Sequence, residues 1–149
     1  MLQPAIQILD SHRMMAISTV RPDGWPQTTI VGYANQGWTL YFEIFRSSQK
    51  FTNIGQDGRV SIAVGSEPRY LSDVRAVYAG AHASEVTDEA ERRMAWELLT
   101  ERHPNLADFD APDDGETAIM RAVCQYVSVL DYSQGIGHTE ALVVDAERA

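Results

Sequence analysis

The sequence of 149 residues contains one cysteine, Cys124, and no hydrophobic run near the ~20 residues that a membrane-spanning helix requires. A single cysteine cannot form an internal disulfide, which agrees with a reducing compartment. The first residues also lack the basic region, the apolar stretch and the small-residue cleavage site of a secretory signal. These absences predict a cytoplasmic protein without a membrane partner.

Positive charge is scarce. The sequence has 12 lysine and arginine residues against 21 aspartate and glutamate residues, a formal net charge of −9. This balance argues against nucleic acid, whose phosphate backbone attracts basic proteins, and against anionic membrane surfaces. Acidic residues crowd residues 85–116, whereas Arg46, Lys50 and Arg59 fall in one short stretch. The pattern favours a small anionic ligand that binds at a local positive site.

Several common enzyme signatures are missing. The sequence has no G-x-S-x-G motif, no P-loop and no G-x-G-x-x-G motif, so it does not indicate a hydrolase, an NTPase or a Rossmann protein. The histidines at positions 12, 82 and 103 have no metal-ligand spacing with one another or with Cys124, so we predict no metal site. Cys124 lies in an alternating strand pattern, which favours a buried core residue over a nucleophile.

What is present is mostly strand. Apolar alternation between turn residues predicts seven strands, at residues 14–20, 27–33, 38–45, 59–64, 75–86, 121–131 and 139–145. Helices are predicted at residues 4–10, 47–54 and 87–102, with a loop at residues 105–116. Gly80 within its strand indicates a β-bulge or a close backbone approach. Because strands follow one another directly, the fold class is α+β, mainly antiparallel β, in one barrel domain over residues 1–149 with a few flanking helices.

Residues 47–50 combine the groups of a phosphate site. Ser47, Ser48, Gln49 and Lys50 open a predicted helix directly after a strand, where free N–H groups and the helix dipole favour an anion. The hydroxyls and the amide supply neutral hydrogen bonds, and Lys50 supplies a positive charge. Serine-rich helix starts are common, so this stretch taken alone favours an ordinary N-cap beside a solvated lysine.

A series of motifs extends this stretch in both directions. In order they are Asp23-Gly24-Trp25-Pro26, Gln27-Thr28-Thr29-Ile30-Val31, Leu40-Tyr41-Phe42, Ser48-Gln49-Lys50, Asn53-Ile54 and Arg59-Val60-Ser61. Together, over about residues 14–64, they resemble the pyridoxamine 5′-phosphate oxidase-like family of FMN-binding split-barrel flavoproteins. The resemblance implies a split β-barrel and a homodimer with cofactor clefts at the subunit interface.

The resemblance also implies which residues contact FMN. They are Thr28, Thr29, Ile30 and Val31 along the ring and ribityl chain, Glu43 and Ile44 beside the ring, Ser48, Gln49 and Lys50 at the phosphate, and Arg75 in a later strand. The family oxidase has arginine where Thr28 and Gln49 stand. Its C-terminal His and Arg substrate motif has no counterpart here, so we do not expect pyridoxamine phosphate oxidase activity itself.

The function implied is an FMN-dependent oxidoreductase that acts on an unidentified small molecule. The flavin carries the electrons in such a site, so no side chain is assigned a catalytic role. Three alternatives stay open. They are a relative that binds a deazaflavin, a haem-binding relative in which His138 ligates the iron, and a flavin-binding or sensing module without turnover.

Overall fold

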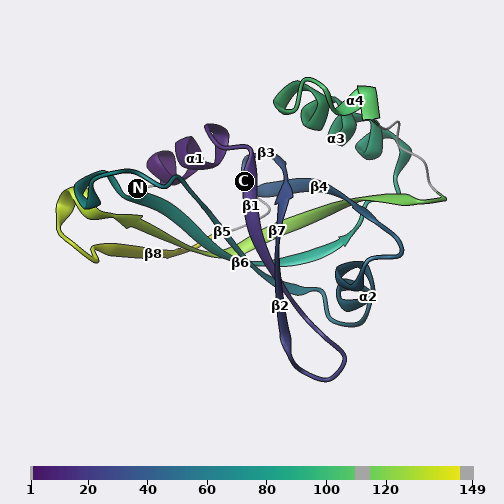
Figure 1. Ribbon diagram of the computed structural model, residues 1–149, viewed down its shortest axis with the longest axis horizontal. Coiled ribbons are helices and arrows are strands. Elements are labelled where there is room, and N and C mark those ends of the chain that lie inside the picture. The colour runs from purple at the N-terminus through teal and green to yellow at the C-terminus, as the bar shows by residue number, and fades with distance from the viewer. Residues whose placement is uncertain (1, 110–114, 145–149) are drawn as a thin grey trace.

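The computed structural model describes residues 2–109 and 115–144, and its main feature is an eight-stranded antiparallel sheet (Figure 1). The strands are β1 (Met14–Val20), β2 (Pro26–Gly32), β3 (Ala34–Gln36), β4 (Thr39–Phe45), β5 (Arg59–Gly65), β6 (Arg75–Glu85), β7 (Thr117–Asp131) and β8 (Thr139–Val143). They follow the order β2-β1-β5-β6-β7-β4-β3, and β8 pairs with β7 off this path.

The helices flank this sheet. They are α1 (Leu2–Asp10), α2 (Gln49–Gln56), α3 (Glu89–Arg102) and α4 (Leu106–Phe109), with short 3₁₀ turns η1 (Leu71–Asp73) and η2 (Tyr132–Gln134). Ser48 and Asp88 cap α2 and α3, because each side chain accepts a backbone N–H three residues further on. The predicted loop at residues 105–116 thus contains a helix, and residues 110–114 of it lie outside the described residues. No described helix is both long enough and apolar enough to span a membrane.

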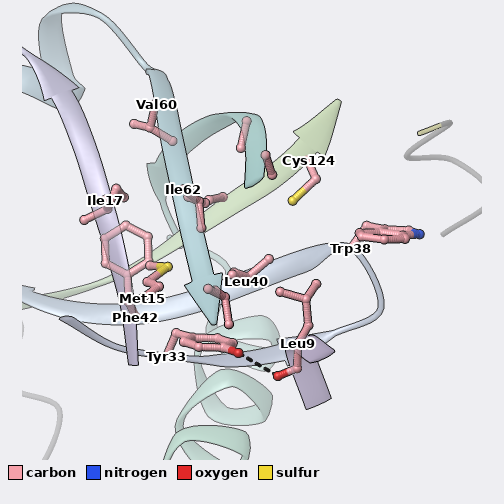
Figure 2. Packing of buried hydrophobic residues seen from close by; sticks show 14 of the residues in the cluster. Leu9, Met15, Ile17, Tyr33, Trp38, Leu40, Phe42, Val60, Ile62 and Cys124 are labelled. Carbon is pink, nitrogen blue, oxygen red and sulfur yellow. Dashed lines mark hydrogen bonds between the residues drawn. The ribbon is translucent and has the colours of Figure 1, made fainter. Parts of the chain in front are cut away.

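The curled sheet encloses one large hydrophobic core (Figure 2). Alternate residues of each strand point inward, such as Met15 and Ile17 of β1 and Leu40 and Phe42 of β4, and all four are almost completely buried. Helix α1 adds Leu9, whose carbonyl accepts a 2.6 Å hydrogen bond from the hydroxyl of Tyr33. Removal of this apolar surface from water is the main force that holds the sheet curled.

The two ends of the sheet path are β2 and β3. Among the described strands, each of the two has a single partner, β1 for β2 and β4 for β3, and β2 comes close to β4 where the barrel is open. The prediction of an α+β split β-barrel is therefore confirmed.

The sequence pattern did not predict two of the strand segments. Residues 117–120 extend β7 beyond its predicted start, and all four are buried. Ala118 and Met120 pack into the barrel core, whereas Ile119 packs under α3, so both faces are covered and no polar alternation is visible. The short connection between the predicted strands 27–33 and 38–45 also contains the three-residue strand β3. Gly37 itself has a φ of 59°, which favours glycine in the tight turn that follows.

Gly80 meets both expectations for its position. The pairing of β6 with β7 shifts between Gly80 and Ala81, so that Gln125 is an extra residue in β7. A β-carbon on Gly80 would lie 3.1 Å from the ring of Tyr126. The predicted bulge and the close approach are therefore both confirmed.

Candidate functional site

A buried asparagine joins the first turn of α2 to the strands beside it. Asn53 is fully buried, and its Nδ2 donates to Thr19 Oγ1 at 2.9 Å and to Gln27 Oε1 at 3.2 Å. Its Oδ1 accepts a 2.8 Å hydrogen bond from Gln49 Nε2. These bonds hold the predicted phosphate stretch against β1 and against the start of β2, the strand predicted to line the flavin.

The three predicted phosphate residues differ in their contacts. Ser48 is the N-cap of α2, because its Oγ donates to the Phe45 carbonyl at 2.7 Å and accepts from the Phe51 N–H at 3.3 Å. Gln49 contacts Asn53, as above. Lys50, the only lysine of the sequence, is half-buried and has no ion pair within the described part of the chain.

The neighbouring arginines are engaged elsewhere. Arg46 forms a two-pronged ion pair with Glu85 at 3.0 and 2.8 Å, and its guanidinium lies 5.5 Å from the centre of the Phe51 ring. Arg59 pairs with Asp57 at 2.8 Å and, through hydrogen bonds to that carboxylate, lowers its pKa to about 2. Of the three cations in this stretch, Lys50 is thus the one available to a ligand in the described structure.

Strand β2 lies at one end of the sheet path, and its side chains alternate between the two faces of the sheet. Thr28 and Ile30 point away from the core, and the Thr28 hydroxyl lies 2.7 Å from the hydroxyl of Ser18. Thr29 and Val31 point the other way, and Val31 packs against the core. The Thr29 hydroxyl oxygen is buried but has no hydrogen-bond partner among the described residues. No described strand pairs with the second edge of β2, so half of its backbone groups are free to meet a ligand.

Glu43 and Ile44 lie on opposite faces of β4. Ile44 points into the barrel core, so only its backbone is available to a ligand. Glu43 lines a cavity of about 240 Å³ between the barrel opening and α3. His103 borders the same cavity, packs against Gly32 at the end of β2 and lies 3.0 Å, through Nε2, from the Tyr33 carbonyl oxygen.

The structure does not bring Arg75 to this region. Arg75 opens β6 and lies 3.5 Å from Asp131, whereas Glu85, the partner of Arg46 beside α2, closes the same strand. Eleven residues of extended strand put roughly 33 Å between them. His138, proposed above as an iron ligand, lies at the Arg75 end, because its carbonyl accepts a hydrogen bond from the Asp131 N–H.

Sequence reasoning placed Asn53 in a family motif, but it assigned neither Asn53 nor His103 to the site. Asn53 has a visible signal, since it stands on the apolar side of a short helix between Phe51 and Ile54, where a polar residue needs a buried partner. His103 has none, because its packing on Gly32 depends on where α3 ends.

Other reactive groups do not add a site. The described residues contain no group of three His, Cys, Asp or Glu side chains that would hold a metal. Cys124 is buried in the core, as expected, and burial raises the pKa of its thiol to about 12. A thiol that stays protonated is a poor nucleophile.

A family model for pyridoxamine 5′-phosphate oxidase matches residues 2–131. This chain belongs to that family. The match extends far beyond residue 64, where the main sequence resemblance ends, and reaches the end of β7. No protein with a curated description matches the chain.

Solved structures share the fold at low sequence identity. A heme binding protein from Mycobacterium smegmatis matches with a TM-score of 0.82 and 17% identity, over 98% of this chain and 58% of its own. This chain thus spans little more than half of that protein. A FAD-binding protein from Mesorhizobium loti matches with a TM-score of 0.69 and 18% identity, over 85% of this chain and 91% of its own. General Stress Protein 26 from Bacillus anthracis matches with a TM-score of 0.71 and 19% identity, over 96% of this chain and 98% of its own.

Proposed function

We propose that this protein binds FMN along β2 and at the first turn of α2, and that it is a cytoplasmic oxidoreductase acting on a small molecule. The observation that carries the proposal is the set of buried Asn53 hydrogen bonds that joins these two segments. Family membership supports the same ligand. Bound FMN supplies the hydride or electron chemistry, while the residues of the chain bind and orient it.

The residues present fit a phosphorylated flavin. Lys50 has a charge that no described carboxylate neutralises, and it follows Gln49 in the first turn of α2. The free backbone N–H groups at the start of a helix favour the binding of an anion. The buried Thr29 hydroxyl lacks a partner on the strand assigned to the ring and ribityl chain. Glu43 of β4 lines a cavity that also borders Gly32, at the end of the same strand.

The two positions where the family oxidase has arginine carry neutral hydrogen bonds in this chain. Thr28 bonds to Ser18, and Gln49 bonds to Asn53. Arg46 does not replace the positive charge of these arginines, because its guanidinium is already paired with Glu85. With Lys50 as the main cation, we expect weaker FMN binding than two further arginines would give, because charge-assisted bonds to phosphate are the strong ones.

Haem is the second candidate ligand. It is supported by the similarity to the heme binding protein of M. smegmatis, and the FAD-binding protein of M. loti extends the flavin candidates beyond FMN. A deazaflavin is the third. In each case the protein is either an enzyme or a binding module without turnover, and we propose that it acts as a homodimer. The cofactor contact of Arg75 and the iron ligation by His138 remain predictions from the sequence.

Absorption spectroscopy with added ligand tests the proposal. FMN, riboflavin, a deazaflavin and haem are titrated separately into the purified protein, and FMN is expected to bind most tightly. In Lys50→Ala the FMN affinity is expected to fall at least tenfold, about 1.4 kcal/mol or more, while the riboflavin affinity stays unchanged. Arg69→Ala, which removes an exposed positive charge elsewhere, is the matched control.

Three results would contradict the proposal. One is the absence of FMN binding, the second is a preference for haem with a Soret band, and the third is an unchanged FMN affinity in Lys50→Ala. Turnover is tested separately. The FMN-loaded protein is reduced chemically, and its reoxidation is followed with candidate small-molecule acceptors under anaerobic conditions.

A further inference from the structure

A cavity of about 390 Å³ lies where the C-terminal ends of α1 and α3 come together. No residue proposed to contact FMN is among its described lining residues. A volume of this size falls within the roughly 300–1,000 Å³ of small-molecule sites. The polar lining residues that matter below are Asp10, His12, Arg13, Glu101 and Arg102, and Leu98 adds an apolar wall.

A buried asparagine fixes two of the charged side chains at this cavity. Asn35 of β3 is 5% exposed; its Oδ1 accepts a 2.7 Å hydrogen bond from Arg102 Nη1, and its Nδ2 donates to Asp10 Oδ1 at 2.8 Å. Arg102 Nη1 also donates to the Leu9 carbonyl at 3.2 Å, and its guanidinium lies 5.4 Å from the centre of the buried Tyr33 ring. Side chains that are already held in place lose little further freedom when a ligand binds. Arg102 and Asp10 are therefore preorganised at the cavity.

Arg13 is held at the same cavity by the end of α3. Its Nε donates to the Arg102 carbonyl at 3.2 Å. These bonds give both arginines a structural role as caps, since basic side chains commonly bind the last carbonyls of a helix. The bonds leave out Nη2 of Arg102 and both terminal nitrogens of Arg13, which have no hydrogen-bond partner among the described residues.

The same two arginines also differ from their counterparts in lacking an acidic partner. Ion pairs with carboxylates hold the arginines at positions 21, 46, 59, 75, 93 and 121. No described carboxylate forms an ion pair with Arg13 or Arg102, although Asp10 and Glu101 line the same cavity. The cavity therefore presents two positive and two negative side chains that are not paired with one another.

We infer that this cavity binds the zwitterion of a free α-amino acid. Planar guanidinium groups bind a carboxylate through paired N–H donors, and Arg13 and Arg102 both have donors that the fold does not use. Asp10 and Glu101 accept hydrogen bonds from an ammonium group. A simple anion meets repulsion from the two carboxylates and a simple cation from the two arginines, so a ligand with both charges matches the lining best. Leu98 offers contact to an apolar side chain.

An NMR titration of the ¹⁵N-labelled full chain without added flavin tests the inference. Glycine, L-alanine and L-leucine are the probes, and acetate and methylamine each carry only one of the two charged groups. At least one of the amino acids is expected to bind saturably and to shift the amide signals of residues 10–13 and 98–102. Acetate and methylamine are expected to bind at least tenfold more weakly than that amino acid.

Two variants locate the site. Arg13→Gln and Glu101→Gln each remove the charge of an exposed side chain and are expected to lower the amino-acid affinity at least tenfold. Glu101 has no hydrogen bond or ion pair among the described residues, so Glu101→Gln keeps the test decisive if Arg13→Gln does not fold. Glu97→Gln makes the same change four residues earlier on α3, outside the described lining of the cavity, and is expected to keep the wild-type affinity.

Three outcomes overturn the inference. They are the absence of saturable binding by all three amino acids, acetate that binds as tightly as they do, and an unchanged affinity in Glu101→Gln. The inference goes beyond the proposed function and is tested separately from it, because the titration contains no flavin. A chain that binds an amino acid as expected but no FMN supports this inference and overturns the cofactor proposal, and a chain that binds FMN alone does the reverse.

Discussion

Asn53 of α2 donates a 2.9 Å hydrogen bond from its side-chain amide to the hydroxyl of Thr19 in β1, and both residues are buried. A buried amide is costly unless its donors and acceptor are paired, and here Gln27 and Gln49 satisfy the rest. The position of α2 on the barrel therefore depends in part on this side chain, beside the packing of Phe51 and Ile54 against the core. The free energy of folding and the geometry of the proposed ligand site are linked through it.

Replacement of Asn53 tests that link. Asn53→Ala is expected to lower the free energy of unfolding by about 2 kcal/mol, because it leaves buried polar groups of its neighbours without partners. Urea denaturation measures this change. The FMN affinity is expected to fall as well, at temperatures where the variant is fully folded.

Thr52→Ala is the control, since Thr52 is the exposed neighbour on the same helix. It is expected to change both quantities little. If Asn53→Ala loses stability but keeps the full FMN affinity, α2 does not need its link to β2 to bind the ligand.

Restoration of an arginine at position 49 is expected to strengthen FMN binding. In Gln49→Arg a second cation joins Lys50 in the first turn of α2, and we expect an affinity gain of about tenfold, or ~1.4 kcal/mol. Riboflavin, which lacks the phosphate, is expected to bind unchanged. Isothermal titration calorimetry with both ligands measures the difference. Gln56→Arg adds the same charge at the exposed end of α2 and controls for net charge; an equal gain there would show a non-specific effect.

The buried thiol of Cys124 makes the stability of the protein depend on pH in the alkaline range. Burial raises the pKa of its thiol from 9.0 to about 12, so the unfolded chain loses this proton first as the pH rises. The contribution of this thiol to stability is thus present below pH 9.0 and is lost as the pH rises from about 9 towards 12. In Cys124→Ala the fall in the free energy of unfolding over this range is expected to be shallower. Native Cys124 is also expected to resist a thiol reagent at pH 8 until urea unfolds the protein; rapid labelling of the native state would argue against the buried position.

Tyr41 ties α3 to the outside of β4. Its hydroxyl donates to Glu91 at 2.9 Å, and the other oxygen of Glu91 lies 2.6 Å from Arg121 of β7. Burial and the bond to Glu91 raise the pKa of Tyr41 to about 12. Tyr41→Phe removes the donor but keeps the ring, so we expect a loss of about 1 kcal/mol in thermal or urea unfolding. Tyr70→Phe, at an exposed position, is expected to cost nothing measurable; an equal loss there would contradict the assigned role.

Local patterns in the sequence determined most of the secondary structure. β1 matches its predicted bounds, 14–20, because one of its faces is buried and the other is not, which makes the alternation visible. The N-cap at Ser48 and the bulge at Gly80 were likewise readable from residue type alone. The ordered motifs of residues 23–61 also sufficed to identify the family, which the family model then showed over residues 2–131.

The tertiary structure decided which of the predicted site residues meet. Asn53 forms hydrogen bonds to β1 and β2, and Glu85 forms an ion pair with Arg46. Arg75 lies at the far end of β6 from Glu85. Each of these relationships joins residues that are distant in the sequence, so the spacing of residues along the chain contains no signal for it. Long-range contacts therefore produced the site on which the proposed function rests.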